Sequence, residues 1–212
     1  MKTLKVILNE ARKELIEKDK IRESTLMDMR KTTSFSKQAI LLVHQKRVKE
    51  AEKLIETATE TLSKLHDTSA THPYIIYGGM YNAALQEYSE ANIFLKLVLE
   101  SRFVAPKEIN VSSTDYVLGL ADVIGECRRW ALDALREGNV KKGEKCLQTM
   151  DEIYVELMAM DESYVLVPGL RRKCDVARKI IEITRGDITQ EIRRSALENH
   201  LKRFEKSAKK RA

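Results

Sequence analysis

Helix breakers are scarce along this chain of 212 residues. It contains only 8 glycines and 3 prolines, and each proline, Pro73, Pro106 and Pro168, falls where a connection between two helices is expected. Hydrophobic residues make up 43% of the sequence, which is enough to build a helical core, while the turn residues that a sheet needs are few. The sequence therefore predicts an all-α fold built from long antiparallel helices.

The spacing of apolar residues divides the chain into seven predicted helices. They cover about residues 4–44, 46–65, 74–102, 112–136, 140–160 and 169–186, and a last helix begins at Asp187. HDTSATHP, residues 66–73, is predicted as a loop, and Gly186 as a helix end. Because no repeat or linker divides the chain, we expect a single helical domain over residues 1–212, with a basic C-terminal extension from about residue 187.

Charge and cysteine content narrow the class of protein. The net charge of +6 and the pI of about 9.1 are compatible with an anionic partner, nucleic acid first. Cys127, Cys146 and Cys174 form no CxxC pair, which is typical of reduced thiols in an intracellular protein. The uncharged runs are too short to cross a bilayer. We therefore expect a cytoplasmic protein without a membrane partner.

Two acids interrupt an apolar stripe in the predicted helix over residues 74–102. In LQEYSEA, residues 85–91, Glu87 and Glu90 lie about one turn apart. At about 100° per residue they share a face with three apolar side chains, Ala83, Phe94 and Leu97.

The predicted helix over residues 112–136 repeats this arrangement. In DYVLGLADVIGE, Asp122 and Glu126 are four residues apart and lie on one face with Gly119, while Gly125 lies at the edge of that face. Glycine inside a helix costs about 1 kcal/mol relative to alanine. Two glycines beside two acids therefore indicate that another helix or a ligand comes close to this backbone.

These four acids can converge if the two helices form an antiparallel hairpin. Four carboxylates packed together repel one another unless some take up protons or a cation binds. Hard oxygen ligands suit Mg²⁺, with Mn²⁺ as the second choice, and Mg²⁺ keeps waters for chemistry on phosphates. No histidine stands at the spacing of a zinc or di-iron site, which favours phosphodiester chemistry over redox chemistry. Acids at these spacings also occur on many solvated helix faces, so a purely structural bundle stays an alternative.

The order of these motifs resembles the translin superfamily. LQEYSEA followed by DYVLGLADVIGE is similar to the acidic motifs of the Trax branch (translin-associated factor X) more than to translin itself. SKQAILLVH, residues 36–44, resembles the first long helix of the family, and the segment from Gly169 to Gly186 resembles its last conserved helix. The resemblance covers about residues 10–187.

The resemblance implies a seven-helix translin-like bundle and a hollow, shell-like homo-oligomer, often an octamer, that binds single-stranded or partly structured RNA and DNA. In the Trax branch it implies a Mg²⁺-dependent endoribonuclease that acts inside the shell. The catalytic acids of the family carry over onto Glu87, Glu90 and Asp122, with Glu126 as a fourth acid, so these four are our candidates for catalysis and metal binding. The retained acids favour the catalytic branch, and a non-catalytic, translin-like binding oligomer is the alternative.

One stretch departs from the family pattern. Relatives often carry basic residues just before LQE, whereas YGGMYNAA, residues 77–84, has two glycines and no positive charge. Contacts to RNA must then come from other basic side chains, unless those form only a solvated basic face. Our candidates are Lys37, His44, Lys46, Arg47, Arg128 and Arg129. Aromatic residues are only 6% of the chain, so we expect recognition of the RNA backbone and no large base-stacking platform.

Two further points stay open. An all-helical nucleotide pyrophosphatase also uses helical carboxylates and Mg²⁺, although its signature is a tighter run of paired glutamates than EYSE. The basic tail could bind RNA, contact another subunit or be mobile. Its charged residues are Lys202, Arg203, Lys206, Lys209, Lys210 and Arg211.

Overall fold

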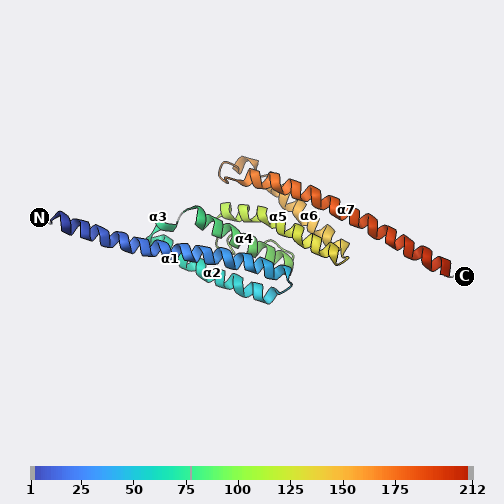
Figure 1. Cartoon of the computed structure of the whole chain (residues 1–212). Coiled ribbons are helices and arrows are strands. Elements are labelled where there is room, and N and C mark those ends of the chain that lie inside the picture. Colours follow the sequence, from blue (N-terminus) through green and yellow to red (C-terminus); the bar gives the residue numbers. More distant parts are fainter. Residues whose placement is uncertain (1–2, 77, 210–212) are drawn as a thin grey trace. The chain divides into compact units, whose positions relative to one another are not determined.

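The computed structural model describes residues 3–76 and 78–209, and within them every regular element is a helix (Figure 1). Two elements are short, α3 (Pro73–Ile76) and the 3₁₀ helix η1 (Asp161–Ser163). The long helices are α1 (Leu4–His44), α2 (Val48–Thr71), α4 (Gly79–Glu100), α5 (Ser113–Arg136), α6 (Val140–Met158) and α7 (Leu170–Lys209). The predicted all-α class is confirmed, whereas the predicted count of seven helices is not confirmed.

The chain divides into two compact units, one ending at Gly119 and the other beginning at Leu120. The first unit contains α1 to α4 and the first turns of α5, and the second contains the rest of α5 with α6 and α7. The boundary falls inside a continuous helix, so it also separates the predicted acids. Glu87 and Glu90 belong to the first unit, and Asp122 and Glu126 to the second. The single domain over residues 1–212 stays a prediction.

In the first unit, α1 lies alongside α2 and α4 (Figure 1). Small hydroxyl residues occupy part of the buried face of α1, and they satisfy their polar atoms within the helix. Thr32 and Ser36 donate to the carbonyl oxygens four residues earlier, at 3.0 and 2.9 Å. The buried residues recur every three or four positions: Thr25, Met29, Thr32, Ser36, Ala39, Ile40 and Val43. This spacing keeps one face of α1 in the core along half of its length.

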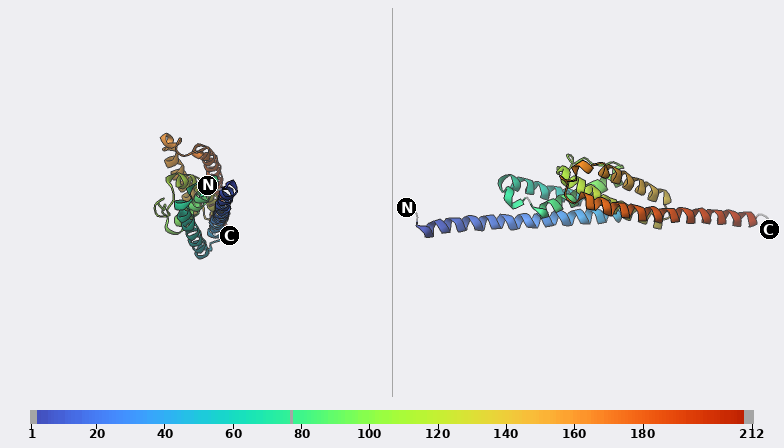
Figure 2. Two further views of the ribbon diagram at one scale, coloured as in Figure 1. Left: turned by 90° about the vertical axis from the view of Figure 1, so that its left-hand side faces the viewer. Right: turned by 90° about the horizontal axis from the view of Figure 1, so that it is seen from above.

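The N-terminal part of α1 extends beyond the other helices of its unit, and the C-terminal part of α7 extends beyond α6 (Figure 2). Both extensions carry exposed apolar side chains, among them Leu8 and Leu15 on α1 and Leu201 and Phe204 on α7. None of the described helices combines the length and the apolar character needed to cross a membrane.

In the second unit, α6 packs against α7, and the core contains aliphatic side chains from α5, α6 and α7. The turn between α5 and α6 is EGN, residues 137–139, which separates the helices predicted over residues 112–136 and 140–160. Gly138 has a φ of +75°, which lets its N–H reach the carbonyl oxygen of Leu135 at 2.9 Å and end α5. Asn139 then caps α6, since its side-chain oxygen accepts from the N–H of Lys142 at 3.0 Å.

The predicted loop over residues 66–73 is wrong except at His72, because α2 continues to Thr71 and α3 begins at Pro73. Polar residues do not by themselves end a helix. Thr68, for example, donates its hydroxyl to a carbonyl oxygen four residues earlier at 2.9 Å. The helix ends at His72, with φ −134° and ψ 59°, since the residue before Pro73 is driven out of the helical region.

The predicted helix end at Gly186 is also wrong, since α7 runs through it to Lys209. Asp187 does not cap a helix; its carboxylate lies 3.3 Å from Arg128 of α5. The same guanidinium donates to the hydroxyl of Thr184 at 2.7 Å. These contacts tie α7 to α5 on both sides of Gly186, and they offset a glycine cost of about 1 kcal/mol.

The predicted helix over residues 74–102 is divided in the structure. α3 ends at Ile76, and Gly78, with extended backbone at φ −173° and ψ 172°, precedes α4. Tyr77, the first residue of YGGMYNAA, lies outside the described residues. At the other end, Ser101 takes a left-handed conformation and stops α4 close to the predicted place.

Candidate functional site

Glu87 and Glu90 lie on α4, in a segment of the first unit that is almost entirely buried. Every residue from Tyr88 to Leu95 is buried, and Glu90 itself is only 9% exposed. A carboxylate at such a position is costly unless partners or a cation meet its charge. Glu87 is more open, and its Oε1 lies 3.1 Å from the Nζ of Lys37 on α1. α4 therefore carries one buried acid and one partly exposed acid, about one turn apart.

Gly119 brings the backbone of α5 against this acidic segment within the first unit. A Cβ at Gly119 would stand 2.6 Å from the carbonyl oxygen of Gln86, 2.7 Å from the Cβ of Ser89 and 3.0 Å from the N of Glu90. Two of these atoms belong to the backbone of α4 and cannot move aside cheaply. Only glycine fits, and the close approach predicted for this position is that of another helix.

The N-terminus of α5 is fixed by a side-chain cap from Ser112. Ser112 accepts from the N–H of Asp115 at 3.0 Å and donates its hydroxyl to Asp115 Oδ2 at 2.7 Å. Gln86 of α4 donates to the other carboxylate oxygen at 3.4 Å. Asp115 is 5% exposed, so this buried acid positions α5 against α4.

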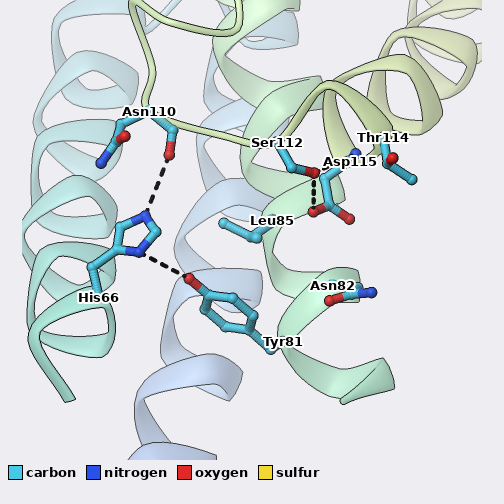
Figure 3. A pocket seen from close by; sticks show the side chains of 8 residues that line it. All are labelled: His66, Tyr81, Asn82, Leu85, Asn110, Ser112, Thr114 and Asp115. Carbon is cyan, nitrogen blue, oxygen red and sulfur yellow. Dashed lines mark hydrogen bonds between the residues drawn. The ribbon is translucent and has the colours of Figure 1, made fainter. Parts of the chain in front are cut away.

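A polar pocket of about 390 Å³ lies beside this cap (Figure 3). His66 points into it, with Nε2 3.4 Å from the carbonyl oxygen of Asn110 and Nδ1 3.3 Å from the hydroxyl of Tyr81. Because a carbonyl oxygen only accepts, Nε2 carries the proton and Nδ1 accepts from Tyr81. Sequence reasoning missed this pocket, since it placed His66 in a loop.

Asp122 lies in the second unit, on the wall of a pocket of about 250 Å³ between α5 and α7. Lys173 of α7 donates to Asp122 Oδ2, and both side chains are partly exposed. Gly125 lines the same pocket, and a Cβ there would meet nothing within 4 Å. Glu126, four residues after Asp122 on α5, is also partly exposed. Sequence reasoning missed Lys173, which is 51 residues away from its partner along the chain.

The acids come in pairs in each unit. Within residues 3–76 and 78–209, no group of three or more His, Cys, Asp or Glu side chains lies together so that it could hold a metal. Mg²⁺ is commonly held by one or two carboxylates together with waters and substrate phosphates, so its chemistry suits the Glu87/Glu90 pair and the Asp122/Glu126 pair. Structural and catalytic Zn²⁺ sites take three or four ligands that include histidine or cysteine, which neither pair supplies.

The predicted basic residues on α1 and its end differ in their surroundings. Lys37 contacts the predicted acid Glu87. His44 stacks on Phe94 with ring centroids 5.0 Å apart, as a histidine of the core edge would. Lys46 is exposed with a left-handed backbone at φ 62°, where α1 ends. The guanidinium of Arg47 donates hydrogen bonds of 2.8 and 2.6 Å to the carboxylate of Glu50. These bonds raise the pKa of Arg47 above its ordinary value.

The basic residues of the second unit also differ. Arg128 contacts Thr184 and Asp187 of α7, as described above, and its binding to nucleic acid stays a prediction. Arg129 is exposed on α5 and remains available to a phosphate. The tail residues Lys202, Arg203, Lys206 and Lys209 are exposed along α7, while Lys210 and Arg211 lie outside the described residues.

Comparison with known proteins identifies the family. The Translin family matches residues 18–183, which is more than half of the chain. The chain belongs to the Translin family. An uncharacterized protein of Methanocaldococcus jannaschii is 34% identical over 193 residues, covering 90% of this chain and 85% of that relative.

Two solved structures resemble this Translin-family chain. AfC3PO, in a complex with duplex RNA, has a TM-score of 0.77 and 36% identity, over 87% of this chain and 95% of that chain. Apo-NeC3PO has a TM-score of 0.76 over 90% of this chain and 98% of that chain, and at 24% identity it supports the fold alone. The range matched by the family contains all four predicted acids and ends before Gly186, so the C-terminal part of α7 lies beyond it.

Proposed function

We propose that this chain is a Trax-like member of the Translin family, a Mg²⁺-dependent endoribonuclease that cleaves single-stranded or partly structured RNA within a hollow, octameric homo-oligomer. Family membership and the likeness to AfC3PO, whose structure contains duplex RNA, support an RNA ligand. Single-stranded DNA is a second ligand of the same backbone chemistry, and Mn²⁺ is a substitute for Mg²⁺.

The observation that carries the proposal is the burial of Glu90. It lies in the most buried stretch of α4, where a structural bundle would place an apolar residue. Next to it, α5 approaches so closely that Gly119 cannot carry a side chain. A divalent cation beside this carboxylate would repay part of the cost of desolvating it, which supports the proposed metal site.

The proposed roles follow from the chemistry of each side chain. Glu87, Glu90 and Asp122 are the residues that would hold the metal, directly or through water, with Glu126 as the fourth acid. Mg²⁺ bound there would supply an activated water and would neutralise charge on the phosphate oxygens. Glu126, the acid that we propose is least committed to the metal, would orient the attacking water as general base. Arg129, which is exposed on the same helix, holds the substrate phosphate.

One observation favours a second candidate, a non-catalytic, translin-like oligomer that only binds RNA or DNA. Lysines already contact two of the four acids, Lys37 at Glu87 and Lys173 at Asp122. If these pairs are permanent, the acids need no metal. Binding would then weaken as salt increases, because it depends on phosphate contacts, and added Mg²⁺ would cause no cleavage.

Cleavage of a labelled single-stranded RNA by the purified protein distinguishes the two candidates. We expect cleavage with Mg²⁺, none with EDTA, and a loss of about 100-fold or more in Glu90→Gln. The matched control is Glu56→Gln, which removes the same charge from an exposed position on α2 and should leave the rate unchanged. Salt-sensitive RNA binding without cleavage in Mg²⁺ or Mn²⁺ would exclude the nuclease and favour the binding oligomer.

A further inference from the structure

The pocket between α5 and α7 in the second unit contains charge of both signs. Asp122 lies on its α5 side, and Arg172 and Lys173 lie on its α7 side. The other lining residues are uncharged: Ala121, Gly125, Val176, Ala177 and Ile180. A pocket with one acid and two adjacent bases can bind a cation and an anion side by side.

The ammonium of Lys173 contacts the carboxylate that we propose as a metal ligand. Lys173 Nζ donates to Asp122 Oδ2, so it occupies one side of this carboxylate. The side chains of Lys173 and Asp122 are 26% and 39% exposed, which leaves the pair open to exchange with solvent ions. Lysine is a compact charge on a flexible stem, so its ammonium can leave the carboxylate without movement of α7.

The pocket has room for the group that would attract a released Lys173. Its volume of about 250 Å³ is several times the roughly 30 Å³ that one water occupies in the liquid. Part of this space exists because Gly125 has no side chain, and a Cβ there would meet nothing within 4 Å. Arg172 also lines the space, and guanidinium and ammonium groups together suit a phosphate.

We propose that Lys173 is the resident counter-ion of the metal site. In the metal-free chain it neutralises Asp122; when a divalent cation binds there, Lys173 is displaced and, with Arg172, holds a phosphate of the RNA in the pocket. This inference rests on the proposed function. Metal binding and RNA binding then strengthen each other. A metal at Asp122 releases Lys173 for the RNA, and RNA that binds Lys173 keeps this ammonium away from Asp122.

The first test measures metal binding without RNA, by electron paramagnetic resonance of Mn²⁺ titrated into the full chain. Lys173→Met removes the competing ammonium, so we expect Mn²⁺ to bind about fivefold more tightly. Lys173→Arg keeps a competing cation and should restore the wild-type affinity. The matched control is Lys179→Met, which removes the same charge from an exposed position on α7.

The second test measures binding of a labelled single-stranded RNA in Ca²⁺ and in EDTA, using Ca²⁺ as a divalent cation that prefers oxygen ligands. In EDTA, the carboxylate of Asp122 competes with the RNA for Lys173, so Lys173→Met should change RNA affinity less than twofold. In Ca²⁺ the same substitution should weaken RNA binding about fivefold or more, because a phosphate contact is lost. Lys179→Met should have the same effect in both conditions.

The outcomes separate this inference from the proposed function. If Lys173→Met and Lys179→Met bind Mn²⁺ equally well while the wild type still cleaves RNA with Mg²⁺, the counter-ion role is wrong and the nuclease stands. Equal losses of RNA affinity in Ca²⁺ and EDTA would also overturn the counter-ion role. If the wild type binds no Mn²⁺, or if Asp122→Asn binds as much Mn²⁺ as the wild type, the metal site itself fails. Both proposals then fail with it.

Discussion

Gly119 and Gly125 lie on the same helix, and their surroundings are opposite. A Cβ at Gly119 would stand 2.6 Å from a backbone oxygen of α4, whereas a Cβ at Gly125 would meet nothing within 4 Å. The first glycine permits α5 to lie against α4 beside Glu90, within the first unit. The second leaves space in the pocket beside Asp122, within the second unit.

In the sequence these two glycines look alike, since each stands within one turn of a predicted metal-binding acid. The cost of glycine inside a helix, about 1 kcal/mol, marks both positions as unusual but does not say why they are tolerated. The structure separates two physical reasons. Gly119 is needed because a neighbouring backbone is too close, and Gly125 is compatible with a ligand because nothing is close.

The largest effect is expected at Gly119, and its absence would contradict this comparison of the two glycines. Gly119→Ala inserts a methyl group between two backbones, so α5 must shift away from Gln86 and Glu90. We expect a loss of about 1–3 kcal/mol in the free energy of unfolding, measured by urea denaturation. An unchanged midpoint would mean that α5 and α4 are not packed as closely as described.

A smaller effect is expected at the cap that fixes the same helix in the first unit. Ser112→Ala removes both hydrogen bonds between this side chain and Asp115. We expect a loss of about 1 kcal/mol in the free energy of unfolding, measured by the same urea titration. Ser112→Asn, which keeps a capping oxygen, should recover most of that stability, and failure to recover it would argue against a capping role.

Gly125 should respond in the opposite direction to Gly119. Gly125→Ala adds a methyl group where there is open space, so only the gain in helix propensity remains. We expect an increase of about 0.5–1 kcal/mol in the free energy of unfolding. A loss of stability in urea denaturation would show that something already fills this part of the pocket.

The smallest effect concerns the three thiols, which all belong to the second unit. Burial raises the pKa of Cys127, Cys146 and Cys174, that of Cys146 from 9.0 to about 11. We therefore expect these thiols to react slowly with a disulfide reagent at pH 8, until urea opens the second unit.

The same pKa shifts set the sign of a pH dependence. The unfolded chain loses its thiol protons near pH 9, before the folded chain does, so folding stability is lost as the pH rises from about 9 to about 11. Replacing Cys146 by Ala should reduce this alkaline loss. Fast labelling of the folded protein at pH 8 would contradict the described burial.

Much of the fold was predictable from the sequence because helix patterns and turn residues are local signals. The bounds of α1 and α5 match the predicted ones, and the turn formed by Gly138 and Asn139 falls in the gap between two predicted helices. The errors arose where tertiary contacts decide. α7 continues through Gly186 because Arg128, from a distant helix, binds on both sides of it.

The positions of the candidate acids on their helices were predictable from the sequence, but the side chains that contact these acids were not. Glu90 and Asp122 stand in motifs with helical spacing, and the family match includes both. Lys173 carries no local signal, since a lysine on an amphipathic helix is ordinary and its contact with Asp122 spans 51 residues. The burial of Glu90, as opposed to the partial exposure of Glu87, likewise depends on how α1, α4 and α5 pack.

The most direct test of the proposed nuclease compares acids from the two units in one experiment. The single-turnover rate of cleavage of a labelled single-stranded RNA in Mg²⁺ would be measured for the wild type, Glu90→Gln and Asp122→Asn. We predict that EDTA abolishes cleavage and that each substitution lowers the rate by about 100-fold or more, because both acids serve one reaction. Metal-dependent cleavage at the wild-type rate in either variant would contradict this prediction.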